Sequence, residues 1–273
     1  MTLRRLALAA VVVSLAAGVP VASAATKPAP RKWAAASTAK VHPGVQTVTV
    51  DSQCTANFVF TAGTSVYLGQ AAHCSSLGGS TDTNGCLTRS RPLGTPVAVE
   101  GYTGTLAYNS WLAMKAARTT DTNTCAYNDL ALIKLPAAAI ATTNPSIPVY
   151  GGPTGLGSST STGESVYSYG NSGLRFGLTP TSPKRGISLG DGAGGWTTTV
   201  YTATPGIPGD SGSGFLDSKG RALGVLSTVG LTPFPLDNGV GNLAREIAFA
   251  RAHGVPGLTL VNGTQPFTPS ALL

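Results

Sequence analysis

A glycine-rich stretch in the last third of the chain, residues 208–214 (Pro-Gly-Asp-Ser-Gly-Ser-Gly), places one serine, Ser211, between small and flexible neighbours. A turn of this kind can bring a hydroxyl and several backbone N–H groups to one point in space. Acyl transfer needs such an arrangement, because the nucleophile must lie beside an oxyanion hole. A Gly/Ser-rich segment between strands can also be no more than a turn. Ser211 is therefore a catalytic candidate only if the chain also supplies a base and an acid that orients the base.

The base has three candidates, since the chain contains His42, His73 and His253. His42 stands beside a proline at the start of the expected ordered region, and His253 closes a helix, where a cation suits the helix dipole. We interpret both of these histidines as structural. His73 differs because it follows a strand directly, within residues 70–74 (Gln-Ala-Ala-His-Cys). The alternative for His73 is a buried ring that bonds a backbone carbonyl, which would hold if no acid could reach it.

The acid candidate is Asp129, which heads the apolar part of residues 127–135 (Tyr-Asn-Asp-Leu-Ala-Leu-Ile-Lys-Leu). A charge at the head of a hydrophobic run is either a solvated turn residue or a buried anion with a dedicated partner. Because His73 lies upstream and Ser211 downstream, the pattern favours the buried anion.

The order His, Asp, Ser along the chain, in these local contexts, resembles the chymotrypsin-like (trypsin-like) serine peptidase family of the secreted bacterial type. The resemblance covers residues 41–254. It is carried by residues 71–74 (Ala-Ala-His-Cys), 128–132 (Asn-Asp-Leu-Ala-Leu) and 209–212 (Gly-Asp-Ser-Gly).

The resemblance implies a role for each of these residues. Ser211 would be the nucleophile, His73 the general base and then the general acid, and Asp129 the group that fixes the imidazole tautomer. The backbone N–H groups of Gly209 and Ser211 would form the oxyanion hole. The implied activity is that of a secreted serine endopeptidase that hydrolyses peptide bonds through an acyl-enzyme.

Four cysteines in an exported chain favour two disulfides, for which three pairings are possible. Metal binding is disfavoured because the chain has no C-x-x-C or H-x-x-x-H spacing, and we expect neither a metal nor a cofactor. The family resemblance implies a bridge between Cys54 and Cys74, which leaves Cys86 and Cys125 for the second. Both bridges would stiffen the half of the site that carries the base and the acid.

Asp210 precedes the candidate nucleophile, and an unpaired carboxylate that turns inward would be costly. In relatives its partner is either a new N-terminus freed by processing or an internal arginine. A cut between Lys40 and Val41 would create such an N-terminus, so the sequence leaves both partners open.

The resemblance also indicates a specificity pocket. Pro205 takes the position where trypsin-like members carry aspartate, so no preference for Lys or Arg at the cleaved bond is expected. Residues Ser227, Thr228 and Val229 take the place of the family's Ser-Trp-Gly strand, with Ser227 as a hydrogen-bond donor to the catalytic aspartate. Val229 would narrow the pocket mouth and favour small apolar side chains. Leu226 precedes them, where glutamate-specific relatives carry a histidine.

The elements that must position these residues are short strands separated by turn clusters. Strands are predicted over residues 45–50, 58–60, 65–69, 95–102, 105–108, 129–135, 165–169, 197–201, 214–216 and 222–227. This pattern is typical of an all-β sandwich or barrel rather than of βαβ units. One helix is predicted over residues 243–253, with Asn242 as N-cap and Gly254 as stop signal. The family resemblance specifies two six-stranded antiparallel Greek-key barrels and a C-terminal helix, with the site between the barrels.

The N-terminal region has the features of an export signal. Arg4 and Arg5 precede the apolar residues 6–19, and the small residues Ala-Ser-Ala follow at 22–24. The apolar run is shorter than the roughly 20 residues of a membrane-spanning helix, so residues 1–25 are interpreted as a signal peptide and the mature protein as secreted. The remaining domain boundaries are expected as follows: 26–40 flexible linker or pro-segment, 41–145 first barrel, 146–262 second barrel with the helix, and 263–273 C-terminal tail.

Charge and composition restrict the partners. From residue 41 onward, 12 basic residues face 11 acidic ones, so the basic character of the chain comes from its N-terminal segments. The folded part offers no basic face with interleaved aromatic residues, which disfavours nucleic-acid binding. We expect protein or peptide substrates, no nucleic acid, no membrane span and a monomer.

Two other functional classes were weighed. An α/β-hydrolase would use Ser211, Asp237 and His253 in that order, but its nucleophile must lie between a strand and a helix, whereas strands and a turn follow Ser211. An exported binding or envelope protein on a protease-like scaffold would keep the triad with a blocked site. Covalent labelling of Ser211 by an active-site reagent would separate the enzyme from this second alternative.

Overall fold

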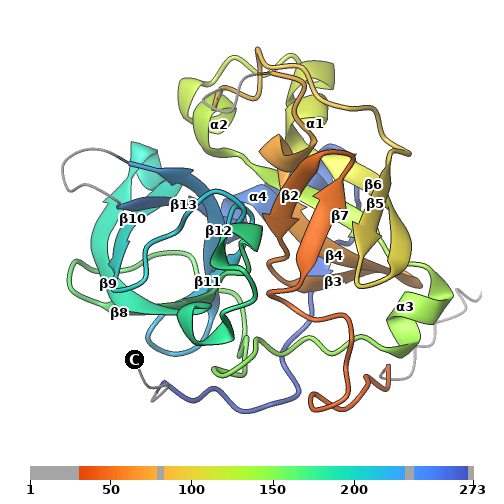
Figure 1. Cartoon of the computed structure of the whole chain (residues 1–273). Coiled ribbons are helices and arrows are strands. Elements are labelled where there is room, and N and C mark those ends of the chain that lie inside the picture. Colours follow the sequence, from red (N-terminus) through yellow and green to blue (C-terminus); the bar gives the residue numbers. More distant parts are fainter. Residues whose placement is uncertain (1–30, 79–82, 231–236, 270–273) are drawn as a thin grey trace, which may run out of the picture. The chain divides into compact units, whose positions relative to one another are not determined.

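The computed structural model describes residues 31–78, 83–230 and 237–269, and residues 33–273 form one compact unit. Strands dominate this unit, in two separate sheets (Figure 1). The predicted signal peptide, residues 26–30 of the predicted linker and the last residues of the predicted tail lie outside the described residues.

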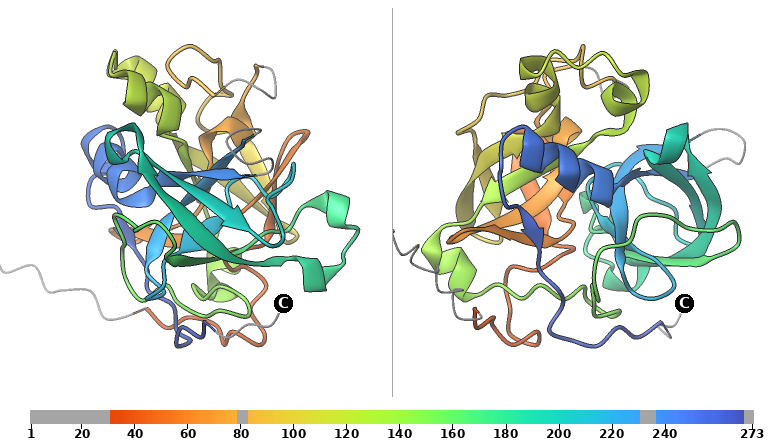
Figure 2. Two further views of the ribbon diagram at one scale, coloured as in Figure 1. Left: turned by 90° about the vertical axis from the view of Figure 1, so that its left-hand side faces the viewer. Right: turned by 180° about the vertical axis from the view of Figure 1, so that it is seen from behind.

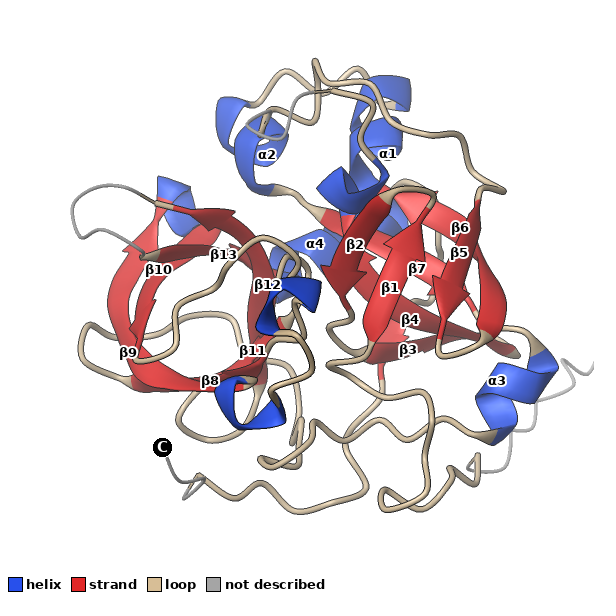
Figure 3. Cartoon of the chain, viewed as in Figure 1, coloured by secondary structure: helices blue, strands red, loops and turns tan. Residues whose placement is uncertain are grey.

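The first sheet carries the His73 and Asp129 region and contains eight antiparallel strands. In spatial order they are β14 (Thr259–Leu260), β3 (Val59–Ala62), β4 (Ser65–Ala71), β7 (Leu130–Lys134), β6 (Tyr102–Asn109), β5 (Pro96–Val99), β1 (Gln46–Thr49) and β2 (Ser52–Thr55). Its apolar side chains, among them Val59, Leu68 and Leu106, form a core of fully buried residues. The sheet is curved but not closed by strand pairing, since β14 and β2 are its two ends (Figure 3).

The strands of the second sheet lie on both sides of Ser211 in the sequence, and they form a closed barrel of six strands. They are β10 (Thr197–Thr202), β13 (Asn238–Asn242), β12 (Ala222–Val229), β11 (Gly214–Leu216), β8 (Ser165–Tyr169) and β9 (Pro183–Gly192). Six buried side chains, including Phe215, Leu226 and Val240, fill its interior. The predicted two-barrel all-β fold is thus confirmed, with one difference: the first of the two sheets has eight strands and stays open.

One predicted strand, residues 95–102, is in fact the end of one strand and the start of the next. Glu100 and Gly101 both have positive φ, 47° and 79°, and Val99 pairs with Tyr102 across them. Two residues with positive φ form the kind of tight turn that suits a hairpin. The chain therefore reverses between β5 and β6 instead of continuing.

The predicted C-terminal helix is α4 (Leu243–Ala252), and the Asn242 side chain caps it by accepting from Arg245 N. It packs against β12 and against α1 (Ser110–Ala116), so it lies between the sheet and the barrel (Figure 2). The other helical segments are α2 (Thr122–Tyr127), α3 (Ala137–Ala141), η1 (Ala72–Ser75), η2 (Gly173–Arg175), η3 (Thr179–Thr181) and η4 (Ala193–Gly195).

Hydrogen bonds attach both the N-terminal and the C-terminal segments of the described chain to the rest of the unit. Residues 33–40, expected as part of a flexible linker, are bound to the segment around Thr143, where Ala34 N donates to Thr143 O (3.0 Å). At the other end, β14 pairs with β3, although residues up to 262 were expected in the second barrel. The unpaired edge of β3 explains this return of the chain, because its N–H and C=O groups need partners.

Candidate active site

His73 lies in η1, directly after β4, and its ring is bound to Asp129. His73 Nδ1 is 2.7 Å from Asp129 Oδ2, and His73 N donates to Asp129 Oδ1 at 2.9 Å. Burial lowers the pKa of His73, but the charge of Asp129 and the hydrogen bond to it more than offset this effect, so the net pKa is raised. Asp129 therefore favours the protonated imidazole, which is the form that a general base becomes.

Asp129 precedes β7 and is only 2% exposed. Besides His73, its carboxylate accepts from the Ser227 hydroxyl, at 2.5 Å to Oδ2. Its backbone is held as well, because Ala72 N donates to Asp129 O (2.8 Å) and Asp129 N donates to Glu246 Oε1 (2.9 Å). The expectation of a buried anion with dedicated partners agrees with this geometry.

Ser211 lies in the turn before β11, between the barrel and the first sheet. Thr55 N donates to Ser211 O (2.8 Å), and Gly212 N donates to Leu226 O (2.7 Å). A Cβ on Gly212 would lie 2.8 Å from Ala71 N, so the turn packs closely against the strand that leads into His73. Among the described residues no hydrogen bond joins the Ser211 hydroxyl to His73; in sites without substrate this contact is commonly long.

The backbone of residues 208–211 orients the two N–H groups that were predicted for the oxyanion hole, those of Gly209 and Ser211. Pro208 O accepts from the Ser172 hydroxyl at 2.5 Å, and the N–H of a trans peptide points opposite to its carbonyl, so the Gly209 N–H faces away from Ser172. Within the described part of the chain, neither Gly209 N nor Ser211 N donates a hydrogen bond. Glycine suits position 209 because its φ is 94°, a backbone conformation that other residues rarely adopt, and a Cβ would lie 3.1 Å from Ser172 Cα.

Asp210 turns inward, as expected, and is fully buried between two cations. Its Oδ2 is 2.6 Å from Arg175 Nη2 and 2.9 Å from Lys184 Nζ. Burial raises the pKa of Asp210, but the hydrogen bonds and charges of Arg175 and Lys184 outweigh it and hold this pKa below its usual value. We call these three residues the Asp210 charge cluster.

In the intact chain the charge cluster supplies one of the two kinds of partner that the sequence left open for Asp210. That partner is an internal arginine, with a lysine beside it. Val41, the residue that processing after Lys40 would free, is fully buried, and its N–H donates to Thr142 O at 3.2 Å.

The residues predicted to form the specificity pocket lie beside the charge cluster and at the end of β12. Pro205 O accepts from Arg175 Nη2 (3.2 Å) and from Lys184 Nζ (3.1 Å). Thr228 and Val229 end β12, and the Val229 side chain is 43% exposed, at the surface of the strand end. Ser227 donates to Asp129 Oδ2, the contact that the family resemblance implies for it.

Sequence reasoning missed three charged residues that contact the predicted site residues, namely Arg175, Lys184 and Glu246. For Glu246 a signal was present: with Leu243, Ile247 and Ala250 it shares the buried side of α4, so a carboxyl group stands in an apolar stripe.

The two disulfides have the predicted pairing, Cys54–Cys74 and Cys86–Cys125. The sulfur atoms of Cys54 and Cys74 lie within 4.8 Å of a His73 ring nitrogen, a spacing that could suggest a metal site. Because both sulfurs are engaged in a disulfide, they are not thiolates and do not form one.

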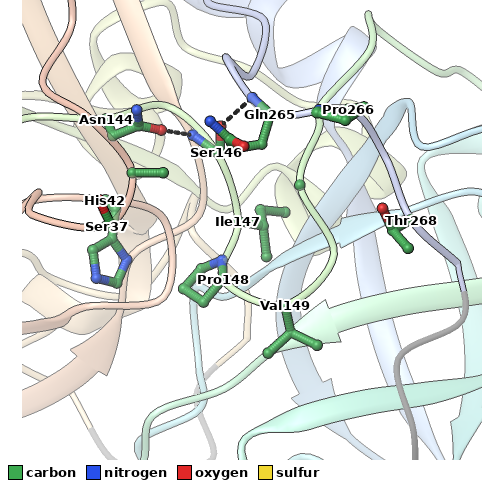
Figure 4. A pocket seen from close by; sticks show the side chains of 12 residues that line it. Ser37, His42, Asn144, Ser146, Ile147, Pro148, Val149, Gln265, Pro266 and Thr268 are labelled. Atoms are coloured by element: carbon green, nitrogen blue, oxygen red, sulfur yellow. Dashed lines mark hydrogen bonds between the residues drawn. The ribbon is translucent and has the colours of Figure 1, made fainter.

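A separate pocket of about 400 Å³ lies away from these residues (Figure 4). It is lined by residues from the N-terminal segment, from the connection between the sheets and from the C-terminal segment, including His42, Asn144 and Gln265. None of the residues discussed as catalytic or as substrate-binding lines it. His42 Nδ1 is 2.7 Å from Pro43 O, in keeping with a structural role.

None of the helices in the described ranges has the length and apolar character that crossing a membrane requires.

Comparisons with known proteins show the fold. No protein-family model matches the chain, and no curated protein matches its sequence. Thermobifida fusca Protease A is similar in structure, with a TM-score of 0.54, 19% identity and coverage of 82% of this chain and 99% of its own. A glutamic acid specific serine protease, described as using a histidine triad in substrate binding, has a TM-score of 0.51, 15% identity and coverage of 81% and 100%. The chain therefore has the two-barrel fold of the bacterial chymotrypsin-like serine proteases.

Proposed function

We propose that the protein is a secreted serine endopeptidase that hydrolyses peptide bonds through an acyl-enzyme. The observation that carries this proposal is the buried Asp129 carboxylate, which binds His73 through both its oxygens at 2.7 and 2.9 Å. A buried carboxylate with an imidazole as its dedicated partner is the part of a serine-hydrolase site that a purely structural role explains least well.

In the proposed mechanism, the Ser211 hydroxyl attacks the substrate carbonyl while His73 Nε2 accepts its proton. His73 Nδ1 keeps its own proton, which stays in the hydrogen bond to Asp129 Oδ2, and the imidazolium then protonates the leaving amine through Nε2. A water molecule attacks the acyl-enzyme by the same route in reverse, with His73 again as base, and releases the acid product.

The developing oxyanion would be bound by the N–H groups of Gly209 and Ser211. Support comes from their freedom from other hydrogen bonds within the described residues and from the glycine-only backbone at position 209. Donors already fixed in place act strongly on a charge that appears only in the transition state.

For the substrate, we propose small apolar side chains at the cleaved bond and no preference for Lys or Arg. Pro205 offers no carboxylate where a basic side chain would need one, and its carbonyl is occupied by Arg175 and Lys184. Leu226 is buried in the barrel core and supplies no imidazole, so the acidic preference of the glutamic acid specific neighbour is not carried over.

The proposal includes export through the predicted signal peptide, followed by action as a monomer on protein or peptide substrates. The two disulfides agree with an oxidising compartment. Sequencing the N-terminus of the secreted protein would test the cleavage after residue 24 or 25 and any later processing.

The decisive experiment is covalent labelling with a sulfonyl fluoride, followed by mass mapping and a peptide-library cleavage profile. We expect one label on Ser211, lost in Ser211→Ala, and no cleavage by that variant. Folded, processed protein that takes no label would indicate an exported binding protein instead. Ser213→Ala is the matched control, since Ser213 is a buried neighbour in the same turn and stays outside the proposed chemistry.

A further inference from the structure

Glu246 is a fully buried carboxyl group on the helix α4, far from the proposed reacting atoms in sequence. Its Oε1 accepts the backbone N–H of Asp129 at 2.9 Å, a contact between residues 117 positions apart. Its Oε2 has no hydrogen-bond partner among the described residues. Burial of a carboxyl group is costly, so a stability role alone would be better served by an apolar residue.

Among the groups around Glu246, the backbone N–H of Asp129 is the one that donates a hydrogen bond to its carboxyl group. From the sheet, Tyr108 of β6 faces it, with a buried hydroxyl that also has no partner among the described residues. From the start of β7 comes Asp129, with His73 on its far side. The two cations of α4 bind elsewhere, Arg245 to Gly194 O and Arg251 to Leu258 O.

The fit around the carboxyl group is close. A Cβ on Gly241, at the end of β13, would lie 2.7 Å from Glu246 Oε1 and 3.0 Å from Tyr127 O. A larger residue at position 241 would displace the Glu246 carboxyl group or press against Tyr127 O, so the side chain of Glu246 is packed closely between the barrel and the segment that carries Asp129. A residue that is itself fixed by packing can hold a neighbouring catalytic group within a fraction of an ångström of its working position.

We propose that Glu246 is a positioning residue of the active site, which holds the backbone of Asp129 so that both carboxylate oxygens meet His73. The inference rests on the proposed function of His73 and Asp129. It adds α4 to the catalytic machinery as the element that fixes the acid, in a chain that runs from Glu246 through Asp129 to His73.

The protonation of Glu246 fits this arrangement. Burial raises the pKa of Glu246, the hydrogen bond from Asp129 N lowers it in part, and the charge of Asp129 raises it, which gives a net pKa of about 8. At neutral pH the group is therefore a neutral acid, which accepts from Asp129 N without placing a second negative charge behind the Asp129 carboxylate.

The test compares Glu246→Leu, which removes the acceptor, with Glu246→Gln, which keeps an oxygen and the shape. We expect Glu246→Leu to lower kcat about 10- to 100-fold through misplacement of Asp129, with KM changed by less than about twofold. We expect Glu246→Gln to restore most of this loss. Glu164→Gln, a partly exposed carboxyl group that binds Ser218, is the control and leaves both constants unchanged.

A second readout needs no substrate and so separates this inference from the proposed function. The pKa of His73, followed by NMR, should fall in Glu246→Leu, because Asp129 raises it only when it is correctly placed. The Asp129 amide proton of the wild type should titrate with a midpoint near pH 8, and this titration should vanish in Glu246→Gln.

The outcomes are distinct. Equal kcat and equal His73 pKa in Glu246→Leu and wild type would overturn the inference even if Ser211 is labelled. A Glu246→Leu variant that does not fold leaves the amide titration and Glu246→Met as tests, and an Asp129 amide that does not respond to the titration of Glu246 at any pH would also overturn it. Absence of labelling with normal NMR behaviour would count against the peptidase and not against the contact.

Discussion

The two halves of the candidate site are held by different interactions. On the His73 side, two disulfides and hydrogen bonds to Asp129 fix the base and the acid. On the Ser211 side no disulfide is present in the described residues, and the turn is anchored by Asp210 between Arg175 and Lys184. The His73 half is held by disulfide-closed loops and by the buried Asp129 carboxylate. The Ser211 half is held by buried ion pairs.

This difference has consequences for stability. A buried ion pair contributes little compared with an apolar replacement, but removal of one partner leaves the other charges buried and unpaired. A disulfide acts mainly on the unfolded chain, so its loss leaves the native geometry intact. The Ser211 half should therefore respond more steeply to a single substitution than the His73 half.

The largest effect is expected for Asp210→Ala, which leaves Arg175 and Lys184 without their counter-charge. The free energy of unfolding should fall by about 3 to 5 kcal/mol, and labelling of Ser211 should be lost with it. Denaturant unfolding and mass mapping measure the two effects. Asp191→Ala, which removes an exposed aspartate from the same barrel, is the control, and a similar loss in both variants would contradict the role of the charge cluster.

The next largest effect on stability is expected in the His73 half of the site. Replacing Cys86 and Cys125 together by alanine opens a loop that closes over a sequence separation of 39 residues. The expected cost is about 2 to 4 kcal/mol of unfolding free energy, with labelling of Ser211 in the folded variant retained. Loss of labelling in a variant that still melts cooperatively would show that the disulfide shapes the site directly.

A smaller effect is expected where the two halves meet. Ser227 extends from the barrel and donates to Asp129 Oδ2, so Ser227→Ala removes the hydroxyl that crosses between them. We expect kcat/KM to fall roughly tenfold, which corresponds to about 1.4 kcal/mol. Ser218→Ala, which removes a hydroxyl bound to the carboxylate of Glu164, should change it by less than about twofold. Equal effects of the two substitutions would mean that the bridge is not used.

The pH dependence of stability compares the two halves without removing a contact, and the two halves should respond in opposite directions. The folded pKa of Asp210 lies below its usual 3.8, so its contribution is present above that value and is lost as the pH falls through the lower folded pKa. The folded pKa of Glu246 is raised from 4.5 to about 8, so its contribution is complete below pH 4.5 and is lost as the pH rises through about 8.

Unfolding at a series of pH values would measure both responses. The stability difference between wild type and Asp210→Asn should shrink in acid, and Glu246→Gln should gain on the wild type between pH 4.5 and about 8. Parallel curves for the wild type and Glu246→Gln over that range would show that Glu246 keeps its usual pKa.

Part of the fold could be predicted because its signals are local. The apolar runs that became β3, β4, β7 and β12 were recognised from their own residues. By contrast, β13 (Asn-Gly-Val-Gly-Asn) and the polar β9 lack alternation, since glycines stand where neighbours pack closely: Thr228 and Glu246 against β13, and Tyr201 O against Gly186 of β9. These two segments adopt the strand conformation because neighbouring strands pair with them, and not because of a pattern in their own residues.

The sequence by itself pointed to the three proposed catalytic residues and to an all-β chain, because these are marked by short motifs and by the strand pattern. The disulfide pairing and the two-barrel plan followed only from the family resemblance that those motifs carry. The tertiary structure decided which buried charges meet: Arg175 and Lys184 at Asp210, and Glu246 at the backbone of Asp129. No local pattern specifies such pairs, since each partner comes from a different element and a buried charge is tolerated only where the folded chain brings its partner to it.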